Sequence, residues 1–152
     1  MRYLTRVTVV AGLALLAGGA FMPMVRSEEP GALSSTAISW EEIEGKTPKG
    51  RGRQVFQQKT ATLDELELHV TVLEVGGSPH PPHKHPDEEV VIIKQGTVEV
   101  MVNGETKRVG PGSVIFQASN QLHGLKNVGD VPAIYHVIKW NSPGMLKARQ
   151  GN

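Results

Sequence analysis

The segment over residues 77–96 contains the side chains best suited to chemistry, a His-x-His pair followed by a carboxylate. His83, His85 and Glu89 are all odd-numbered. Side chains alternate between the two faces of an extended strand, so a regularly paired strand here would direct all three to one side. Imidazole and carboxylate groups brought together in this way are typical metal ligands, and His123 is a fourth candidate downstream. The pattern predicts a metal site.

Composition narrows the possible chemistry. The chain has 152 residues, enough for one domain with its own core, and it contains no cysteine. The absence of cysteine excludes disulfides, thiolate metal sites and cysteine nucleophiles. A metal site in this protein must therefore use nitrogen and oxygen ligands.

The N-terminus predicts export. Over residues 1–20, Arg2 and Arg6 are followed by an uncharged, mostly apolar stretch that ends in small residues, as in a secretory signal peptide. Cleavage after Ala20, or as late as about residue 26, would leave the protein periplasmic or secreted, with the membrane involved only through the signal. An uncleaved anchor is the alternative, because about 20 apolar residues span a bilayer. Several glycines and a proline shorten the apolar region and favour cleavage.

The charge balance gives little indication of a polyanionic partner. Removal of the signal takes away two arginines, so the formal net charge changes from +1 to about −1. One basic cluster remains among glycines and a proline: Lys46, Lys49, Arg51 and Arg53. It could bind a phosphate or an anionic polysaccharide, but no aromatic side chain is interleaved to stack on bases. We interpret the cluster as a solvated loop and expect no nucleic-acid partner.

The rest of the N-terminal region leads into a single folded domain. Residues 27–35 are rich in Glu, Pro, Gly and Ser, which predicts a flexible tether. Ser39 and Glu42 have the spacing of a helix cap and its reciprocal partner, so a short helical turn is expected there, with an irregular lead into a strand as the alternative. The domain is expected over residues 36–142, and a C-terminal tail over residues 143–152.

Within the domain, short β-strands alternate with glycine-containing turns. Strands are predicted at residues 66–72, 90–93, 98–102, 107–109, 113–117, 123–127 and 133–140. Asn103-Gly104 predicts a hairpin turn. About seven short strands without a long helix indicate an all-β sandwich or barrel.

Two motifs in this region resemble those of the cupin superfamily. The first cupin motif is matched at every specified position by Gly77-x5-His83-x-His85-x3-Glu89-x6-Gly96. The second is matched less fully by Gly112-x5-Ala118-x-Asn120-x2-His123-x3-Asn127. Ala118 and Asn120 stand where the family pattern has proline and glycine, which concerns the local turn more than the ligand. The chain is therefore similar, over residues 66–140, to a small single-domain cupin.

The resemblance implies a double-stranded β-helix, that is a jelly-roll barrel, closed around a metal ion. It implies four metal ligands: His83, His85, Glu89 and His123. Three neutral imidazoles and one carboxylate suit Fe, Mn, Ni, Cu, Co or Zn, whereas Mg and Ca prefer oxygen shells. An octahedral ion held by four protein ligands keeps two positions for water, dioxygen or a bidentate substrate.

The other histidines are expected to be hydrogen-bonded structural residues: His69, His80 and His136. His80 precedes a stiff Pro-Pro pair near the predicted site, so it could instead orient a ligand or meet substrate. Glu88 has the wrong parity to join the ligands and should point outward.

Several residues near the second motif could shape a pocket, although plain packing is the simpler interpretation for each of them: Met101, Phe116, Gln117, Asn120, Gln121, Leu122 and Tyr135. Arg108 and Lys126 are the nearest fixed cations for a carboxylate substrate, but the strand phase leaves them unassigned. The sequence assigns no substrate-binding residue.

Two classes of function stay open. The one that we favour is a metal-dependent enzyme on a small polar or aromatic molecule, in which Glu89 acts as a base. An oxygenase-type reaction is preferred, and isomerase and lyase types are the alternatives. The alternative is a non-catalytic cupin that binds a small ligand, a sugar or the metal itself. A homodimer is expected, with residues 36–60 supplying an extra strand and residues 90–93 offering an open apolar edge.

Overall fold

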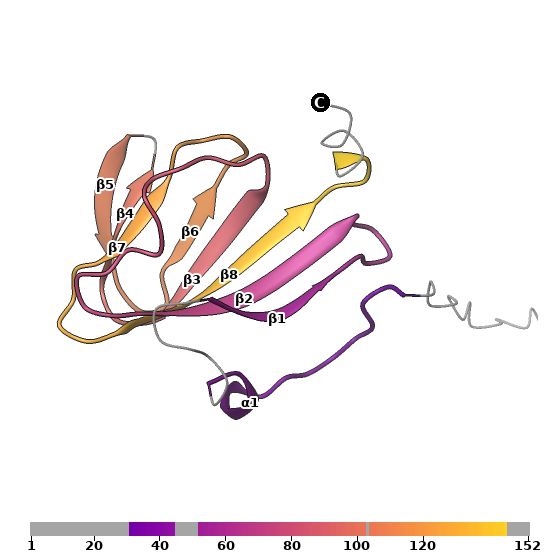
Figure 1. Ribbon diagram of the computed structural model, residues 1–152, viewed down its shortest axis with the longest axis horizontal. Coiled ribbons are helices and arrows are strands. Elements are labelled where there is room, and N and C mark those ends of the chain that lie inside the picture. Colours follow the sequence, from indigo (N-terminus) through magenta and orange to yellow (C-terminus); the bar gives the residue numbers. More distant parts are fainter. Residues whose placement is uncertain (1–30, 45–51, 103, 146–152) are drawn as a thin grey trace, which may run out of the picture.

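A computed structural model describes residues 31–44, 52–102 and 104–145. Within these ranges the chain forms one short helix and eight strands (Figure 1). Their bounds are α1 Trp40–Glu44, β1 Gly52–Gln58, β2 Glu65–Leu73, β3 Glu88–Gln95, β4 Val98–Val102, β5 Glu105–Val109, β6 Val114–Gln117, β7 Gly124–Asn127 and β8 Ala133–Asn141. In the described part of the chain, no helix has the length and apolar character to cross a membrane. The predicted signal peptide lies outside the described residues.

The strands form two antiparallel sheets (Figure 1). The larger sheet has the strand order β1-β2-β8-β3-β6, and the smaller has the order β5-β4-β7. This is the all-β jelly-roll architecture that the strand pattern and the motifs predict. All seven predicted strands are present, with bounds within two residues of the expected ones.

A hydrophobic core fills the space between the sheets. Its buried residues are Leu73, Val91, Ile93, Val98, Val100, Ile115, Leu125, Ala133, Tyr135 and Val137. On β2, β3 and β8 these core residues are all odd-numbered, so odd-numbered positions of the three strands face the interior. Even-numbered Val70 and Ile134 pack instead against Ile43 of α1, on the outer face of the larger sheet.

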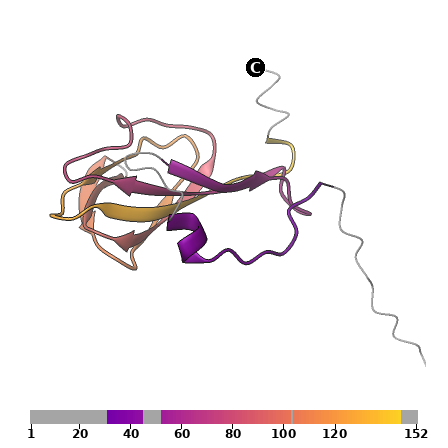
Figure 2. The same cartoon turned by 60° about the horizontal axis from the view of Figure 1, so that its bottom comes forward.

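The predicted helix cap is confirmed. The backbone N–H of Glu42 donates to Oγ of Ser39 at 3.3 Å, and the backbone N–H of Ser39 donates to Oε2 of Glu42 at 2.7 Å. This reciprocal pair satisfies amide groups that the first turn of a helix leaves without partners. Figure 2 shows α1 against the outer face of the larger sheet, where Nζ of Lys94 lies 3.4 Å from the centroid of the Trp40 ring.

The interpretation of the basic cluster as a solvated loop is wrong for Arg53. This residue lies in β1, and its guanidinium donates to the carbonyl oxygens of Glu42 at 2.6 Å and Ile43 at 2.8 Å. Arg53 therefore satisfies carbonyl groups at the C-terminal end of α1. The other three members of the cluster lie outside the described residues.

One structural ground for the expected homodimer is wrong. β3 lies between β8 and β6, so residues 90–93 do not form an open edge. β1 pairs in antiparallel register with β2 of the same chain and is an edge strand of the larger sheet, so the contribution of residues 36–60 to a dimer stays a prediction. The homodimer itself stays a prediction.

Candidate metal centre

Three histidine side chains converge in the folded chain: His83, His85 and His123. Their candidate ligand nitrogens all lie within 4.8 Å of one another. The centroid of the His123 ring lies 4.6 Å from that of the His83 ring and 4.8 Å from that of the His85 ring. The structure therefore brings together three of the four expected ligands in a group of the size that a metal ion requires.

Backbone hydrogen bonds hold the two motifs together. His83 and His123 form an isolated antiparallel bridge, in which each backbone N–H donates to the other residue's carbonyl oxygen, at 3.0 and 2.9 Å. The backbone N–H of Asn120 donates to the carbonyl oxygen of His85 at 2.7 Å. Because these bonds fix the main chain on both sides, the three rings start from defined positions.

The three histidines converge, but the expectation that alternation along one regular strand would bring His83 and His85 together with Glu89 is wrong. β3 begins at Glu88, so His83 and His85 lie before the strand that carries Glu89. The bridge between His83 and His123, rather than strand alternation, brings the rings to one place.

Two of the rings have their tautomer fixed by a backbone carbonyl. Nδ1 of His123 lies 2.9 Å from the carbonyl oxygen of Gln121, and Nδ1 of His85 lies 3.1 Å from that of Asp87. A carbonyl oxygen only accepts, so in each neutral ring Nδ1 carries the proton and Nε2 carries the free lone pair. This arrangement is the one by which proteins orient histidine toward a metal.

Two buried ring nitrogens in the group have no hydrogen-bond partner: Nδ1 of His83 and Nε2 of His123. Leaving a buried polar atom unpaired costs about 1–3 kcal/mol. A divalent ion held by three imidazoles would satisfy a buried ring nitrogen of this kind, so the residues present fit a metal of the transition series.

Glu89 lies beside His85 and lines the same cavity as the three histidines. Its Oε2 is 3.5 Å from Nε2 of His85. Burial raises the pKa of Glu89 to about 7, although the charge of Lys139 opposes the shift. A carboxyl group at this place can serve as a further ligand or as a base near neutral pH.

His83 and His85 are held in the neutral form that binds metals. Burial, assisted by the neighbouring rings of His80, His123 and His85, lowers the pKa of His83 to about 4. Burial also lowers the pKa of His85, with the charge of His123 adding to the effect. Metal ligation requires neutral imidazole, so neither ring needs to release a proton at neutral pH.

The group opens onto a cavity of about 480 Å³. Cavities of roughly 300–1,000 Å³ are typical of sites for small molecules. Val91, Leu125 and Val137 supply apolar wall, while His83, His85, His123 and Glu89 lie on the same cavity. A small molecule bound here would contact the candidate metal group directly.

A row of polar side chains crosses the inner face of the larger sheet at this cavity. Lys139 of β8 is the register partner of Glu67 on β2 and of Glu89 on β3, and Glu89 is the partner of Gln117 on β6. Nζ of Lys139 lies 2.8 Å from Oε2 of Glu67. Lys139 thus places a cation between two carboxylates, one of which is a candidate ligand.

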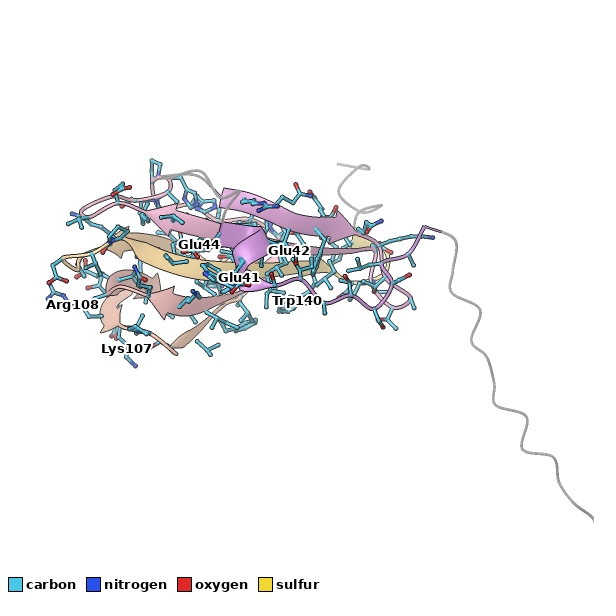
Figure 3. All side chains as sticks on the ribbon, turned by 90° about the horizontal axis from the view of Figure 1, so that it is seen from below. Glu41, Glu42, Glu44, Lys107, Arg108 and Trp140 are labelled. Carbon is cyan, nitrogen blue, oxygen red and sulfur yellow. The ribbon has the colours of Figure 1, made fainter. Side chains whose placement is uncertain are left out.

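Sequence reasoning missed Lys139 and named other cations instead. Arg108 and Lys126 are exposed on the smaller sheet and are not among the residues that line the cavity. Figure 3 shows Arg108 and Lys107 projecting from the outer end of the molecule. Lys139 and the core residue Tyr135 are both odd-numbered positions of β8, so the alternation of side chains along this strand indicated that Lys139 faces the interior.

The other histidines divide between the two faces. His69 and His80 line the cavity, and the His80 ring lies 3.9 Å from that of His83, centroid to centroid. His136 lies on the outer face, 5.9 Å from the Trp40 ring. Glu88 is the register partner of Trp140 and lies on the face opposite to Glu89.

The predicted pocket residues also divide. Gln117 and Tyr135 line the main cavity. A separate groove of about 120 Å³ is lined by Met101, Phe116, Gln121 and Leu122, among others. Asn120 lines neither cavity, and its backbone N–H donates to the carbonyl oxygen of His85.

Comparison with known families gives one match. The family model described as "Cupin domain" matches residues 69–139, a range that includes all four expected ligands. No match was found among curated proteins.

Solved structures of similar fold come from proteins with different roles. One is a cupin domain from Schizosaccharomyces pombe, with 19% identity, 66% of this chain and 69% of that chain covered, and a TM-score of 0.55. Another is a cupin domain of an XRE family transcriptional regulator from Enterobacter cloacae, with 19% identity and a TM-score of 0.52. The match covers 61% of this chain and 96% of that chain. A third is the DMSP lyase DddQ from Ruegeria pomeroyi, with 25% identity and a TM-score of 0.50. The match covers 61% of this chain and 47% of that chain. A regulator domain and a lyase share this architecture, so fold alone does not choose a function.

Proposed function

We propose that this jelly-roll protein is a divalent-metal-dependent enzyme acting on a small molecule. The family match and the structural neighbours support the cupin superfamily. The observation that carries the proposal is the pair of unpartnered buried nitrogens, Nδ1 of His83 and Nε2 of His123, at a cavity of about 480 Å³. His85 completes the histidine group, and Glu89 is the fourth ligand that we propose.

The ligand set suits manganese, iron, cobalt, nickel, copper or zinc. When bound, such an ion would supply Lewis-acid polarisation of a substrate oxygen. The specific form that we propose is an oxygenase-type reaction, because three histidines and one glutamate resemble the ligands of cupin dioxygenases. Cupin isomerases and lyases share this likeness and are the alternatives.

The chain's own residues supply the remaining functions. Glu89 can hold or release a proton at neutral pH, because burial raises its pKa to about 7. Tyr135 stays protonated, because burial raises its pKa to about 12 even though a hydrogen bond from Thr71 opposes the shift. Val91 and Val137 exclude water from one part of the wall. This convergence of titratable groups on one cavity supports an enzyme over a simple binding module.

Metal analysis tests the proposal. The mature protein would be purified without chelators or a histidine tag, beside a His83→Ala/His123→Ala double variant and a His136→Ala control on the outer face. We expect near-stoichiometric metal in the wild type and the control, and its loss from the double variant. Iron, copper or nickel would then direct the search to dioxygen consumption, and zinc or manganese to isomerase, lyase or hydrolase substrates.

Absence of metal after reconstitution with each candidate ion would overturn the proposal. The protein would then be better described as a non-catalytic cupin that binds a small ligand or a sugar. Equal metal content in the double variant and the wild type would also contradict it, because the ion would then lie elsewhere.

We propose further that the protein is exported, with residues 1–20 as a cleaved signal. N-terminal sequencing of the protein recovered from a bacterial periplasm checks this, and an uncleaved chain in the membrane fraction would indicate an anchor instead. Light scattering of the mature protein at micromolar concentration checks the predicted homodimer.

A further inference from the structure

His69 stands apart from the metal group but opens onto the same cavity. It occupies an odd-numbered, inward-facing position of β2 and lines the cavity together with His83, His85 and His123. Its Nδ1 lies 2.8 Å from Oε1 of Glu67. An ionised carboxylate only accepts, so in the neutral ring Nδ1 carries the proton and Nε2 carries the free lone pair.

Glu67 is itself held in its ionised form. Burial opposes ionisation, but the hydrogen bond and charge of Lys139, together with those of His69, lower the pKa of Glu67 overall. One carboxylate oxygen contacts His69 and the other contacts Nζ of Lys139, each at 2.8 Å. Lys139, Glu67 and His69 therefore form a connected chain that fixes the orientation of the ring.

Burial lowers the pKa of His69, although Glu67 opposes the shift. The ring is therefore neutral at pH 7, with a lone pair able to accept a proton. A carboxylate behind Nδ1 would stabilise the imidazolium that forms when Nε2 is protonated.

The neighbouring strand leaves room at this ring. A Cβ at Gly52 of β1 would lie 3.1 Å from Cδ2 of His69 and 3.7 Å from its Nε2. Gly52 does not have a positive φ, so its backbone conformation does not require glycine. The missing side chain instead keeps the Nε2 side of His69 open to the cavity.

We propose that His69 is a proton-transfer residue for a substrate that presents an O–H or N–H group in this cavity, with Glu67 and Lys139 as its positioning residues. The inference rests on the proposed function, because one substrate would contact both the metal group and His69. In the step, Nε2 takes the substrate proton, and the electron pair of the broken O–H or N–H bond stays on the substrate atom. A later step returns the proton to product, so His69 ends in its starting form.

The tautomer of His69 is the first test, and it needs no variant. Histidine ¹⁵N NMR on the wild-type protein, metal-free and zinc-loaded, is expected to find the His69 proton on Nδ1 and the lone pair on Nε2. A proton fixed on Nε2 would overturn the inference, because no acceptor would then face the cavity.

Reactivity toward diethyl pyrocarbonate is the second test, followed for each histidine by peptide mass spectrometry. Nε2 attacks a carbonyl carbon of the reagent, a C–N bond forms and the anhydride C–O bond breaks. Ethyl carbonate leaves, takes up the Nδ1 proton and decays to ethanol and carbon dioxide. We expect His69 to react in the wild type, and Glu67→Gln to slow it roughly tenfold, the effect of losing one charge-assisted hydrogen bond.

Glu65→Gln is the matched control. Glu65 lies on the same strand and accepts hydrogen bonds from Gln57 at 3.0 Å and Asn141 at 3.3 Å, not from His69. Its replacement should leave the His69 rate unchanged. An unreactive His69 in the wild type, or equal rates in the Glu67→Gln and Glu65→Gln variants, would overturn the inference.

The metal content separates this inference from the proposed function. Normal metal content with an unreactive His69 would overturn only the role of His69. A metal-free protein with the expected tautomer and reactivity would overturn the proposed function alone, because neither His69 readout depends on a bound ion.

Discussion

The backbone N–H of Asn120 donates to the carbonyl oxygen of His85 at 2.7 Å, and Asn120 makes this bond in the left-handed conformation, with φ 58°. Asparagine stands here where the cupin pattern has glycine. Among residues with a side chain, asparagine is one of the few that adopt this conformation readily. The departure from the motif therefore preserves the turn, and Ser119 adds a second tie by donating its hydroxyl to the carbonyl oxygen of Pro86 at 2.7 Å.

Replacement of Asn120 by valine should disturb both stability and metal binding. A β-branched residue at positive φ costs about 1–3 kcal/mol, and the displaced turn would move the N–H group that donates to the carbonyl oxygen of His85. Asn120→Gly should behave like the wild type, because glycine adopts the same conformation without strain. Thermal unfolding and zinc titration of the two variants measure the effect. Equal behaviour of the valine and glycine variants would contradict the role assigned to this turn.

Gly96, which follows β3, should tolerate no side chain. Its φ is 82°, and a Cβ there would lie 2.7 Å from Cα of Ala133. We expect Gly96→Ala to cost about 3 kcal/mol or more, since a backbone clash adds to the conformational penalty. Gly104→Ala is the control, because Gly104 has φ 80° but no atom within 4 Å of the added Cβ. Denaturant unfolding should find that the control loses only about 1–2 kcal/mol, and similar losses in both would refute the clash.

Asn127 connects three segments of backbone. Its side chain is fully buried, with Nδ2 donating to the carbonyl oxygens of Leu73 at 3.0 Å and Val131 at 2.9 Å, while Oδ1 accepts from the N–H of Gly129 at 3.0 Å. Asn127→Ala should destabilise the protein by about 3 kcal/mol or more, since each buried partner left unpaired costs about 1–3 kcal/mol. Gln57→Ala, which removes an exposed amide-to-carboxylate bond, should cost less than about 1 kcal/mol. Comparable losses in calorimetry would argue against the buried network.

The strands could be predicted where the signal was local. Alternating valines and the Asn-Gly pair defined the strand 98–102, and the structure places β4 over the same residues. β1 carries no such signal, because it is mostly polar and its only large apolar residues are Val55 and Phe56. Pairing with β2 and the contact of Arg53 with α1 stabilise β1, and neither can be read from residues 52–58 alone.

The site was predictable to the extent that motif spacing defined it. His83, His85 and His123 were found because the family pattern places them, while strand parity gave the wrong physical reason. Lys139 was missed because its contact with Glu67 depends on pairing between β2 and β8, and His69 was predicted only as a hydrogen-bonded structural residue. Such long-range register requires the fold, and a single sequence does not encode it in any local window.

The final prediction concerns the pH dependence of stability in the metal-free protein. Burial raises the pKa of Glu89 from 4.5 to about 7. Folding therefore takes up a proton between these values, and the stability that Glu89 contributes is present below pH 4.5 and is lost as the pH rises through 7. Glu89→Gln does not titrate and should be the more stable protein at pH 8, by at most about 3 kcal/mol, since each pKa unit corresponds to about 1.36 kcal/mol. The difference should vanish near pH 4.5.

Zinc should reverse this order. Burying a carboxylate without a partner is costly, whereas a carboxylate beside a bound cation is stabilised, so the wild type should gain more from zinc than Glu89→Gln does. The low pKa of His83 destabilises both proteins equally as the pH falls from 6.5 toward 4, so it cancels in the comparison. Urea unfolding gives the free energy of unfolding of the wild type and of Glu89→Gln, each with and without zinc, at several pH values. If Glu89→Gln were more stable than the wild type by the same amount at pH 5 and pH 8, packing rather than the buried charge would set the difference. If the variant were still the more stable protein in zinc, Glu89 would not be a metal ligand.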